Sequence, residues 1–227
     1  MKKIHTTFLI ILIGLSSLAQ PSLQWAKTFD GTTGTDQGNV ITLDASGNVF
    51  VGCSSDGFGT GSDYLTIKYN SNGDTIWTKR YNGTGNGTDE IKGIKVDVSG
   101  NVYITGRSLG NGTGYDFVTV KYNSIGDTVW TRRYNGSASL DDIGYSLVVD
   151  GNGNVYVVGS SLYSGNTETT GITIKYNSSG VQQWVQPSYW SGASPDNETN
   201  NLVMLNSTGN IMILRIVISM MPTEFLK

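Results

Sequence analysis

The sequence predicts an all-β protein built from β-propeller-type four-stranded blades. Two observations lead to this fold class. The chain repeats itself at a shift of about 53 residues over nearly everything after Trp25. Each repeat contains short runs rich in Val, Ile, Thr and aromatic residues, separated by Gly, Asn, Asp and Ser clusters, which is the pattern of strands joined by hairpins. No stretch after the leader shows a 3.6-residue apolar rhythm of helical length. Four strands in a repeat of this size form one propeller blade.

The first 19 residues predict a secretory signal peptide. Two lysines precede an apolar run from Phe8 to Leu15, and small residues lead to a cleavage site near Ala19–Gln20. This run is shorter than the roughly 20 residues that a membrane-spanning helix needs, and no later run reaches that length. We therefore expect a secreted protein, either extracellular, at the cell surface or periplasmic, without a membrane span.

Charge and rare residues exclude several classes of function. Cleavage of the leader removes the only histidine, His5, and leaves 13 Lys and Arg against 18 Asp and Glu, a formal charge of −5. This balance argues against nucleic-acid binding, and the lost histidine excludes His-based catalysis and the usual zinc sites. Cys53 is the single cysteine, so it forms no intrachain disulfide and is expected to pack at a strand end. We expect no cofactor and no metal.

The repeats divide the chain after the leader. "WTKRYNG" at 77 corresponds to "WTRRYNG" at 130, and "TIKYNSNGDTIW" at 66 corresponds to "TVKYNSIGDTVW" at 119. The second repeat predicts strands at 91–97, 102–107, 117–123 and 128–134. The propeller region is predicted to span 20–210, with repeats near 25–76, 77–129, 130–183 and 184–210. Residues 211–227 are expected to be an aberrant or truncated end of the fourth repeat, so that about three and a half blades are present.

The repeated motif "D-x-S-G-N-V-Y-x-x-G" followed by "K-Y-N-x-x-G-D-T-x-W" resembles the SBBP, or β-propeller repeat, family of exported bacterial proteins. The resemblance covers roughly residues 25–210. It implies a propeller scaffold and no particular reaction. A left-handed β-helix or a β-sandwich is the alternative fold.

Loop lengths suggest which end of the blades carries function. The connections "VSGN" and "NSIGD" are tight and lie at one end, because antiparallel strands alternate in direction. The connections "SLGNGTGYD" and "NGTGNGTDE" are expected to be long and to share the opposite end, which we call the long-loop face. Longer loops on a rigid scaffold often carry binding residues. Our candidates there are suited to sugar or peptide recognition. They are the repeat-breaking residues Phe58, Arg107, Tyr115 and Tyr163, with Asp116 nearby and Trp190 in the last long connection.

Residues that recur in every repeat are expected to be structural. The acids Asp36, Asp89 and Asp142 are predicted to cap backbone N–H groups where a loop enters a strand, and paired glycosidase carboxylates are the alternative. The glycines of "SGN" and "NGN" are predicted to occupy positive-φ hairpin positions, with the start of a calcium loop as the alternative. These glycines are Gly47, Gly100 and Gly153.

The recurring tryptophans and basic pairs also receive structural roles. Packing between neighbouring blades is predicted for Trp25, Trp77, Trp130 and Trp184. The basic pairs that follow two of these tryptophans, at 79–80 and 132–133, are predicted to protect an exposed outer edge from pairing with other chains.

Three functional hypotheses remain open from the sequence. The first is a secreted or surface-displayed, non-enzymatic module that binds a protein or a glycan through the long-loop face. The second is a truncated fragment of a larger propeller without its own activity. The third is a hydrolase acting on carbohydrate. Self-association through unclosed blade edges is a further expectation.

Overall fold

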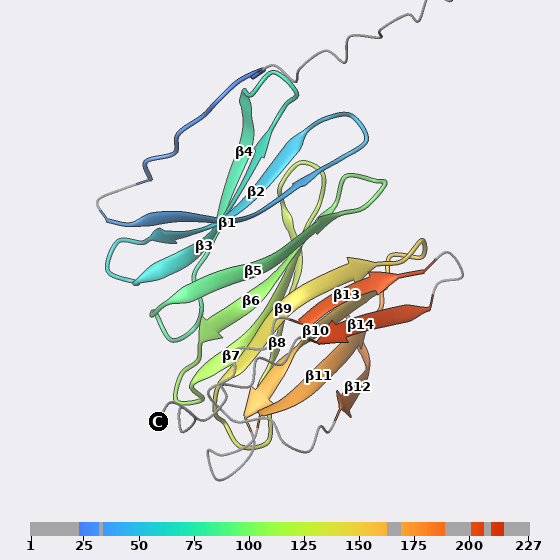
Figure 1. The fold of residues 1–227 in the computed structure, drawn as a ribbon. Coiled ribbons are helices and arrows are strands. Elements are labelled where there is room, and N and C mark those ends of the chain that lie inside the picture. Colours follow the sequence, from blue (N-terminus) through green and yellow to red (C-terminus); the bar gives the residue numbers. More distant parts are fainter. Residues whose placement is uncertain (1–22, 32–33, 163–168, 189–200, 207–209, 216–227) are drawn as a thin grey trace, which may run out of the picture.

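The computed structural model describes residues 23–31, 34–162, 169–188, 201–206 and 210–215. Its strands form three four-stranded sheets and one two-stranded sheet (Figure 1). The first sheet contains β1 (Asp36–Leu43), β2 (Val49–Asp56), β3 (Ser62–Tyr69) and β4 (Thr75–Tyr81). The second contains β5 (Asp89–Val96), β6 (Val102–Leu109), β7 (Tyr115–Tyr122) and β8 (Thr128–Tyr134). The third contains β9 (Asp142–Val149), β10 (Val155–Leu162), β11 (Thr169–Tyr176) and β12 (Gln182–Ser188).

Each four-stranded sheet is an antiparallel meander in chain order, and we call these sheets blades 1, 2 and 3. The first strands of successive sheets contact one another, β1 with β5, β5 with β9, and β9 with β13 (Asn201–Leu205). The sheets therefore stand face to face in sequence order, as Figure 1 shows. This arrangement confirms the predicted fold class of four-stranded, propeller-type blades.

The core lies between the blades. One cluster joins Phe50, Tyr64 and Trp77 of blade 1 to blade 2 residues that include Ile104 and Tyr122. A second cluster joins blades 2 and 3 in the same way. Because a middle blade is covered on both faces, its two central strands bury nearly every side chain, which explains their dense Val, Ile, Thr and aromatic content.

The second blade confirms the four predicted strands but corrects one loop. Strand β6 runs two residues further than predicted, and β7 begins two residues earlier, because Ser108 pairs with Asp116 and Leu109 pairs with Tyr115. The connection expected to be long is therefore only residues 110–114. The sequence "SLGNGTGYD" resembles a loop, but its first two and last two residues form cross-strand pairs. The connections between blades, at 82–88 and 135–141, remain the longer ones at this end.

The fourth sheet contains β13 and β14 (Ile211–Arg215), which pair antiparallel. Val203 packs on blade 3 against Val148, Tyr156 and Val158. Residues 211–215 were expected to be aberrant, but they form a second strand beside β13 and so continue the blade pattern. Their apolar side chains are compatible with a strand. No helix among the described residues is long and apolar enough to cross a membrane.

Candidate interaction surfaces

The recurring acids cap backbone N–H groups, as predicted. Oδ2 of Asp89 accepts a hydrogen bond of 2.6 Å from the Gly83 N–H, and Oδ2 of Asp142 accepts one of 2.6 Å from the Gly136 N–H. Asp36 does the same for Gly31 at 2.8 Å. Burial raises the pKa of Asp89, and it raises the pKa of Asp142 to about 6. These carboxylates lie beneath the loops, where they fix the entry into the first strand of each blade.

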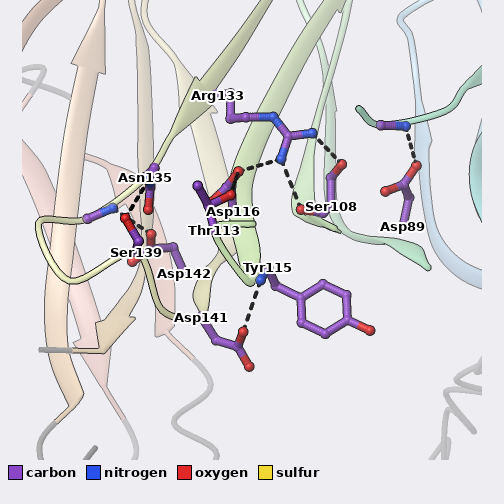
Figure 2. A network of polar contacts seen from close by, with 12 residues as sticks. Asp89, Ser108, Thr113, Tyr115, Asp116, Arg133, Asn135, Ser139, Asp141 and Asp142 are labelled. Atoms are coloured by element: carbon purple, nitrogen blue, oxygen red, sulfur yellow. Dashed lines mark hydrogen bonds and ion pairs between the residues drawn. The ribbon is translucent and has the colours of Figure 1, made fainter. Parts of the chain in front are cut away.

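A second set of acids is neutralised by arginines (Figure 2). Nη1 of Arg133 lies 2.6 Å from Oδ2 of Asp116 and 3.0 Å from the Ser108 carbonyl, while Nη2 donates to the Ser108 hydroxyl at 2.7 Å. Arg80 makes the same contacts in blade 1 with Asp63 and Ser55. Each arginine thus ties the outermost strand of its blade to the two strands inside it.

These contacts correct the prediction that the basic pairs protect an edge. Arg80 and Arg133 turn inward because a buried carboxylate without a cation would be strongly destabilising. Their neighbours also reach protein groups: Lys79 lies 3.9 Å from Asp127, and Arg132 donates to the Gly180 carbonyl.

Blade 3 lacks this ion pair. Its equivalents of Asp116 and Arg133 are Thr170, opposite Ser161, and Pro187, opposite Ile172. Both partners are replaced together, which is consistent with the cost of leaving one charge buried alone. Comparison of the three repeats for positions that change together could have revealed this pair from the sequence.

The hairpin glycines have the predicted conformation. Gly47, Gly100 and Gly153 have φ values of 78°, 78° and 76°. The aspartate at the start of each turn stabilises the turn through its carboxylate. Oδ1 of Asp97, for example, accepts hydrogen bonds of 2.9 Å from the N–H groups of Ser99 and Asn101. Within the described residues, no group of three or more His, Cys, Asp or Glu side chains is placed to hold a metal.

Of the four recurring tryptophans, Trp77 and Trp130 pack between blades as predicted, whereas Trp25 and Trp184 each contact a single blade among the described residues. Trp77 and Trp130 are buried at the two interfaces, and Trp25 contacts Tyr69 of blade 1. Trp184 contacts Tyr156 of its own blade and is 38% exposed. Cys53 is buried, as expected, but it lies within β2, where it pairs with Leu65, and not at a strand end. Burial raises the pKa of its thiol.

Two predicted binding residues form one unit on the long-loop face. The Arg107 guanidinium lies 4.5 Å from the centroid of the Tyr115 ring, and Nε and Nη2 of Arg107 are each 2.9 Å from Oε2 of Glu90. The Tyr115 N–H donates to Oδ1 of Asp141 at 2.9 Å. Figure 2 shows the Tyr115 ring pointing away from the Arg133 network. The ring is therefore held by its backbone while it projects from the blade.

The other candidates are placed differently. Phe58 is 86% exposed in the β2–β3 loop. Asp116 is only 1% exposed and is occupied by Arg133, so it corrects the expectation of an accessible loop acid. Tyr163 and Trp190 lie outside the described residues.

A family model described as β-propeller repeat, SBBP, matches residues 76–112 and 129–162. The chain carries SBBP β-propeller repeats. The matched segments begin on the outermost strand of one blade and run into the next blade, so the SBBP sequence unit is offset from the structural blade by one strand.

Several solved structures resemble the SBBP blades at low sequence identity. They include the eukaryotic initiation factor (9% identity, TM-score 0.40, covering 70% of this chain and 35% of that chain). Another is the Pseudomonas brassicacearum lignostilbene dioxygenase (11%, 0.44, 74% and 40%). A third is the subtype N11 neuraminidase-like protein of A/flat-faced bat/Peru (10%, 0.37, 75% and 56%). The chain thus spans between about a third and just over half of the length of these proteins. No curated protein matches the chain.

The SBBP blades interlock at the long-loop face. Gly61 lies so close to the next inter-blade loop that a Cβ there would be 3.0 Å from the Gly87 carbonyl carbon. A Cβ on Gly85 would likewise be 2.7 Å from the Leu109 carbonyl oxygen, and one on Gly114 would be 2.8 Å from Asp141. Glycine allows this close approach, so the β2–β3 and β6–β7 loops lie directly against the two inter-blade connections.

A groove of about 580 Å³ lies at the opposite, tight-turn end, between SBBP blades 2 and 3. Lys95, Tyr103 and Lys121 line it together with the hairpin turns that begin at Asp97 and Asp150. The Tyr103 hydroxyl donates to Oδ2 of Asp97 at 2.9 Å. Loop length alone did not indicate this recess, because it arises from the spacing between two blades.

Proposed function

We propose that this chain is an exported, non-enzymatic β-propeller module that binds carbohydrate through its long-loop face. The observation that carries the proposal is the Arg107–Tyr115 unit, in which a guanidinium lies 4.5 Å from the centroid of a projecting aromatic ring. An aromatic face with a few fixed polar groups suits a sugar ring and its hydroxyls. Glu90, beside Arg107, adds a hydrogen-bond acceptor.

The rigidity of the surface supports this role. Tyr115 is anchored through its own N–H to Asp141, which belongs to the loop that leads into blade 3. Binding by a surface that is already ordered costs less conformational entropy than binding by a loop that must first become ordered.

A non-enzymatic role is favoured by the state of the recurring carboxylates. Glycosidase chemistry requires one protonated and one ionised carboxyl group on either side of the scissile bond. Asp89 and Asp142 are fully buried and bind backbone N–H groups, and Asp116 is bound to Arg133. A substrate would therefore have to displace the backbone N–H group or the arginine that each of these carboxyl groups already binds.

Binding would be tested on an array of immobilised oligosaccharides with the labelled mature chain. We expect a defined subset of glycans to be bound, and we expect Tyr115→Ala and Arg107→Ala to weaken binding by roughly tenfold, or ~1.4 kcal/mol. Lys95→Ala, in the groove at the opposite end, is the matched control and should bind like the wild type. Equal binding by the Tyr115 variant, loss only in the Lys95 variant, or binding to immobilised proteins and to no glycan would overturn the proposal.

Export would be tested by fusing residues 1–25 to a reporter enzyme that is active only outside the cytoplasm. We expect activity with the native leader and its loss with Ile11→Asp, which places a charge in the apolar run. Equal reporter activity from the two fusions would contradict export through this leader.

A further inference from the structure

The chain contains six Asn–Gly dipeptides, and all of them lie within the described residues. Asn–Gly is prone to spontaneous deamidation, because glycine lacks the Cβ that would hinder its backbone nitrogen. By sequence the six are equivalent, so a difference in their reactivity must come from the fold. They are Asn72–Gly73, Asn82–Gly83, Asn86–Gly87, Asn111–Gly112, Asn135–Gly136 and Asn152–Gly153.

Deamidation begins when the glycine nitrogen attacks the side-chain amide carbon of the preceding asparagine. A new N–C bond forms, and the amide nitrogen leaves as ammonia with the proton that the glycine nitrogen has lost. Water then opens the resulting cyclic succinimide and gives aspartate or isoaspartate. A hydrogen bond from the glycine N–H opposes the first step, because it must be broken before the nitrogen can react. The asparagine side chain must also be free to turn toward that nitrogen.

Four of the six glycine N–H groups already donate hydrogen bonds. The N–H groups of Gly83 and Gly136 are each 2.6 Å from the buried carboxylate that they cap. Gly73 and Gly153 donate to backbone carbonyls within their own hairpin turns, at 3.0 and 2.9 Å. The fold therefore protects these four dipeptides from the first step of the reaction.

The fifth dipeptide, Asn86–Gly87, is held by packing. The Asn86 side chain accepts a hydrogen bond of 2.8 Å from Asn82, and the φ of Asn86 is 47°. A Cβ on Gly87 would overlap the Leu109 side chain, and a Cβ on Gly61 would be 3.0 Å from the Gly87 carbonyl carbon. Rotation of this segment toward a succinimide would therefore collide with a neighbouring strand and a neighbouring loop.

Asn111–Gly112, at the tip of the loop between β6 and β7, has none of these restraints. Both residues are exposed, and a Cβ on Gly112 would meet no atom within 4 Å. Within the described part of the chain, neither the Asn111 side chain nor the Gly112 N–H makes a hydrogen bond. The Gly110 N–H closes the loop below them by donating to the Gly114 carbonyl at 2.7 Å. The tip can therefore rearrange while the blade stays folded.

We propose that Asn111 is the site at which the folded chain spontaneously deamidates. It is the asparagine that combines a free attacking N–H, a free side chain and open space. The product adds a negative charge to the long-loop face, in the loop that leads into Tyr115, and the isoaspartate form also lengthens the backbone there. The assignment does not depend on carbohydrate binding, because it follows from hydrogen bonds and packing alone.

The test is tryptic peptide mapping by mass spectrometry during incubation of the mature folded chain at mildly alkaline pH. Cleavage after Arg107 and Lys121 releases residues 108–121, in which Asn111 is the single asparagine. We expect Asn111 to deamidate roughly tenfold faster than any of the other five, a difference of ~1.4 kcal/mol in activation free energy.

The same chain unfolded in guanidinium chloride is the matched control. Without the fold, the six dipeptides should react at similar rates, because each then presents the same local chemistry. A second readout uses the intact chain, since isoelectric focusing separates the more acidic product. Asn111→Gln should suppress the acidic form that accumulates first in the wild type, because glutamine forms the corresponding ring far more slowly.

Two results would overturn the proposal. One is a folded chain in which Asn111 reacts no faster than another of the six asparagines, or does not react at all. The other is an unfolded chain in which Asn111 keeps the same lead over the other five, which would attribute its reactivity to flanking sequence and not to the fold.

Discussion

The Arg133 guanidinium on the outermost strand of blade 2 lies 2.6 Å from the Asp116 carboxylate, which is almost completely buried on the neighbouring strand. The same arginine also binds the carbonyl and hydroxyl of Ser108 on the strand beyond. A single side chain therefore connects three of the four strands in the blade.

Removal of Arg133 should be more harmful than removal of the whole ion pair. Arg133→Met leaves the Asp116 charge buried, and because Arg133 is partly exposed we expect a loss of ~2–4 kcal/mol in the free energy of unfolding. Adding Asp116→Thr, which copies Thr170 of blade 3, should recover part of that loss. Urea denaturation of both variants checks this, and a double variant less stable than Arg133→Met would contradict it.

Asp142 should make the protein less stable as the pH rises from about 4 to about 6. Burial, with the charges of Asp116 and Asp141, raises the pKa of Asp142 in the folded state to about 6, above the ordinary value of 3.8. Between these values the folded chain holds a proton that the unfolded chain has lost, so the contribution of Asp142 to stability falls as the pH rises and is constant above about 6.

Asp142→Asn should therefore reduce this pH dependence by about 1–3 kcal/mol between pH 4 and pH 7. Urea denaturation at several pH values measures the effect. Asp74→Asn, in an exposed turn, is the control and should follow the wild-type profile. An Asp142→Asn profile parallel to that of the wild type would show that this carboxyl group does not titrate in the expected range.

Gly100→Ala should destabilise the chain by about 1–2 kcal/mol. Its φ of 78° lies in the left-handed region, which is unfavourable for a residue with a Cβ. Gly151→Ala is the matched control in the corresponding turn of blade 3, since a Cβ there meets nothing within 4 Å and its φ is not in that region. Thermal melting separates the two variants, and equal melting temperatures would argue against the conformational explanation.

Trp77→Ala should lower the free energy of unfolding by about 3–5 kcal/mol, because it empties a buried site between two blades. Trp184→Ala should cost less, since Trp184 contacts one ring and is partly exposed. Urea denaturation at a concentration where the chain is monomeric gives both values. Equal losses would indicate that a further group covers Trp184.

Much of the fold was predictable from repeated residues. Recurrence at one period predicted the caps made by Asp89 and Asp142, the turn at Gly100 and the inter-blade packing of Trp77. The reason is that every blade needs the same caps, turns and packing residues at the same positions. The loop at 110–114 was predicted less well. Its flanking polar residues resemble a turn in sequence but pair across strands β6 and β7.

The candidate site was predictable only in part. Arg107 and Tyr115 stood out because they break the repeat, and the structure brings them into contact. Nothing in a single repeat indicated that Asp116 is buried, and its burial became evident only from the structure, where Arg133 lies beside it. The groove near Lys95 could not be predicted, because it depends on the distance between two separately folded sheets.

The sequence by itself determined the four-stranded unit, its hairpins and its period, because hydrogen bonding and turn chemistry act between residues close in the chain. Only the tertiary structure decided which polar side chains face inward and which residues of neighbouring blades meet. Those outcomes depend on contacts about 50 residues apart, such as Trp77 with Ser124, where burial sets the free energy of each group. For the same reason, Trp130 and Trp184 occupy the same position of the repeat, yet Trp130 is buried between two blades and Trp184 is 38% exposed.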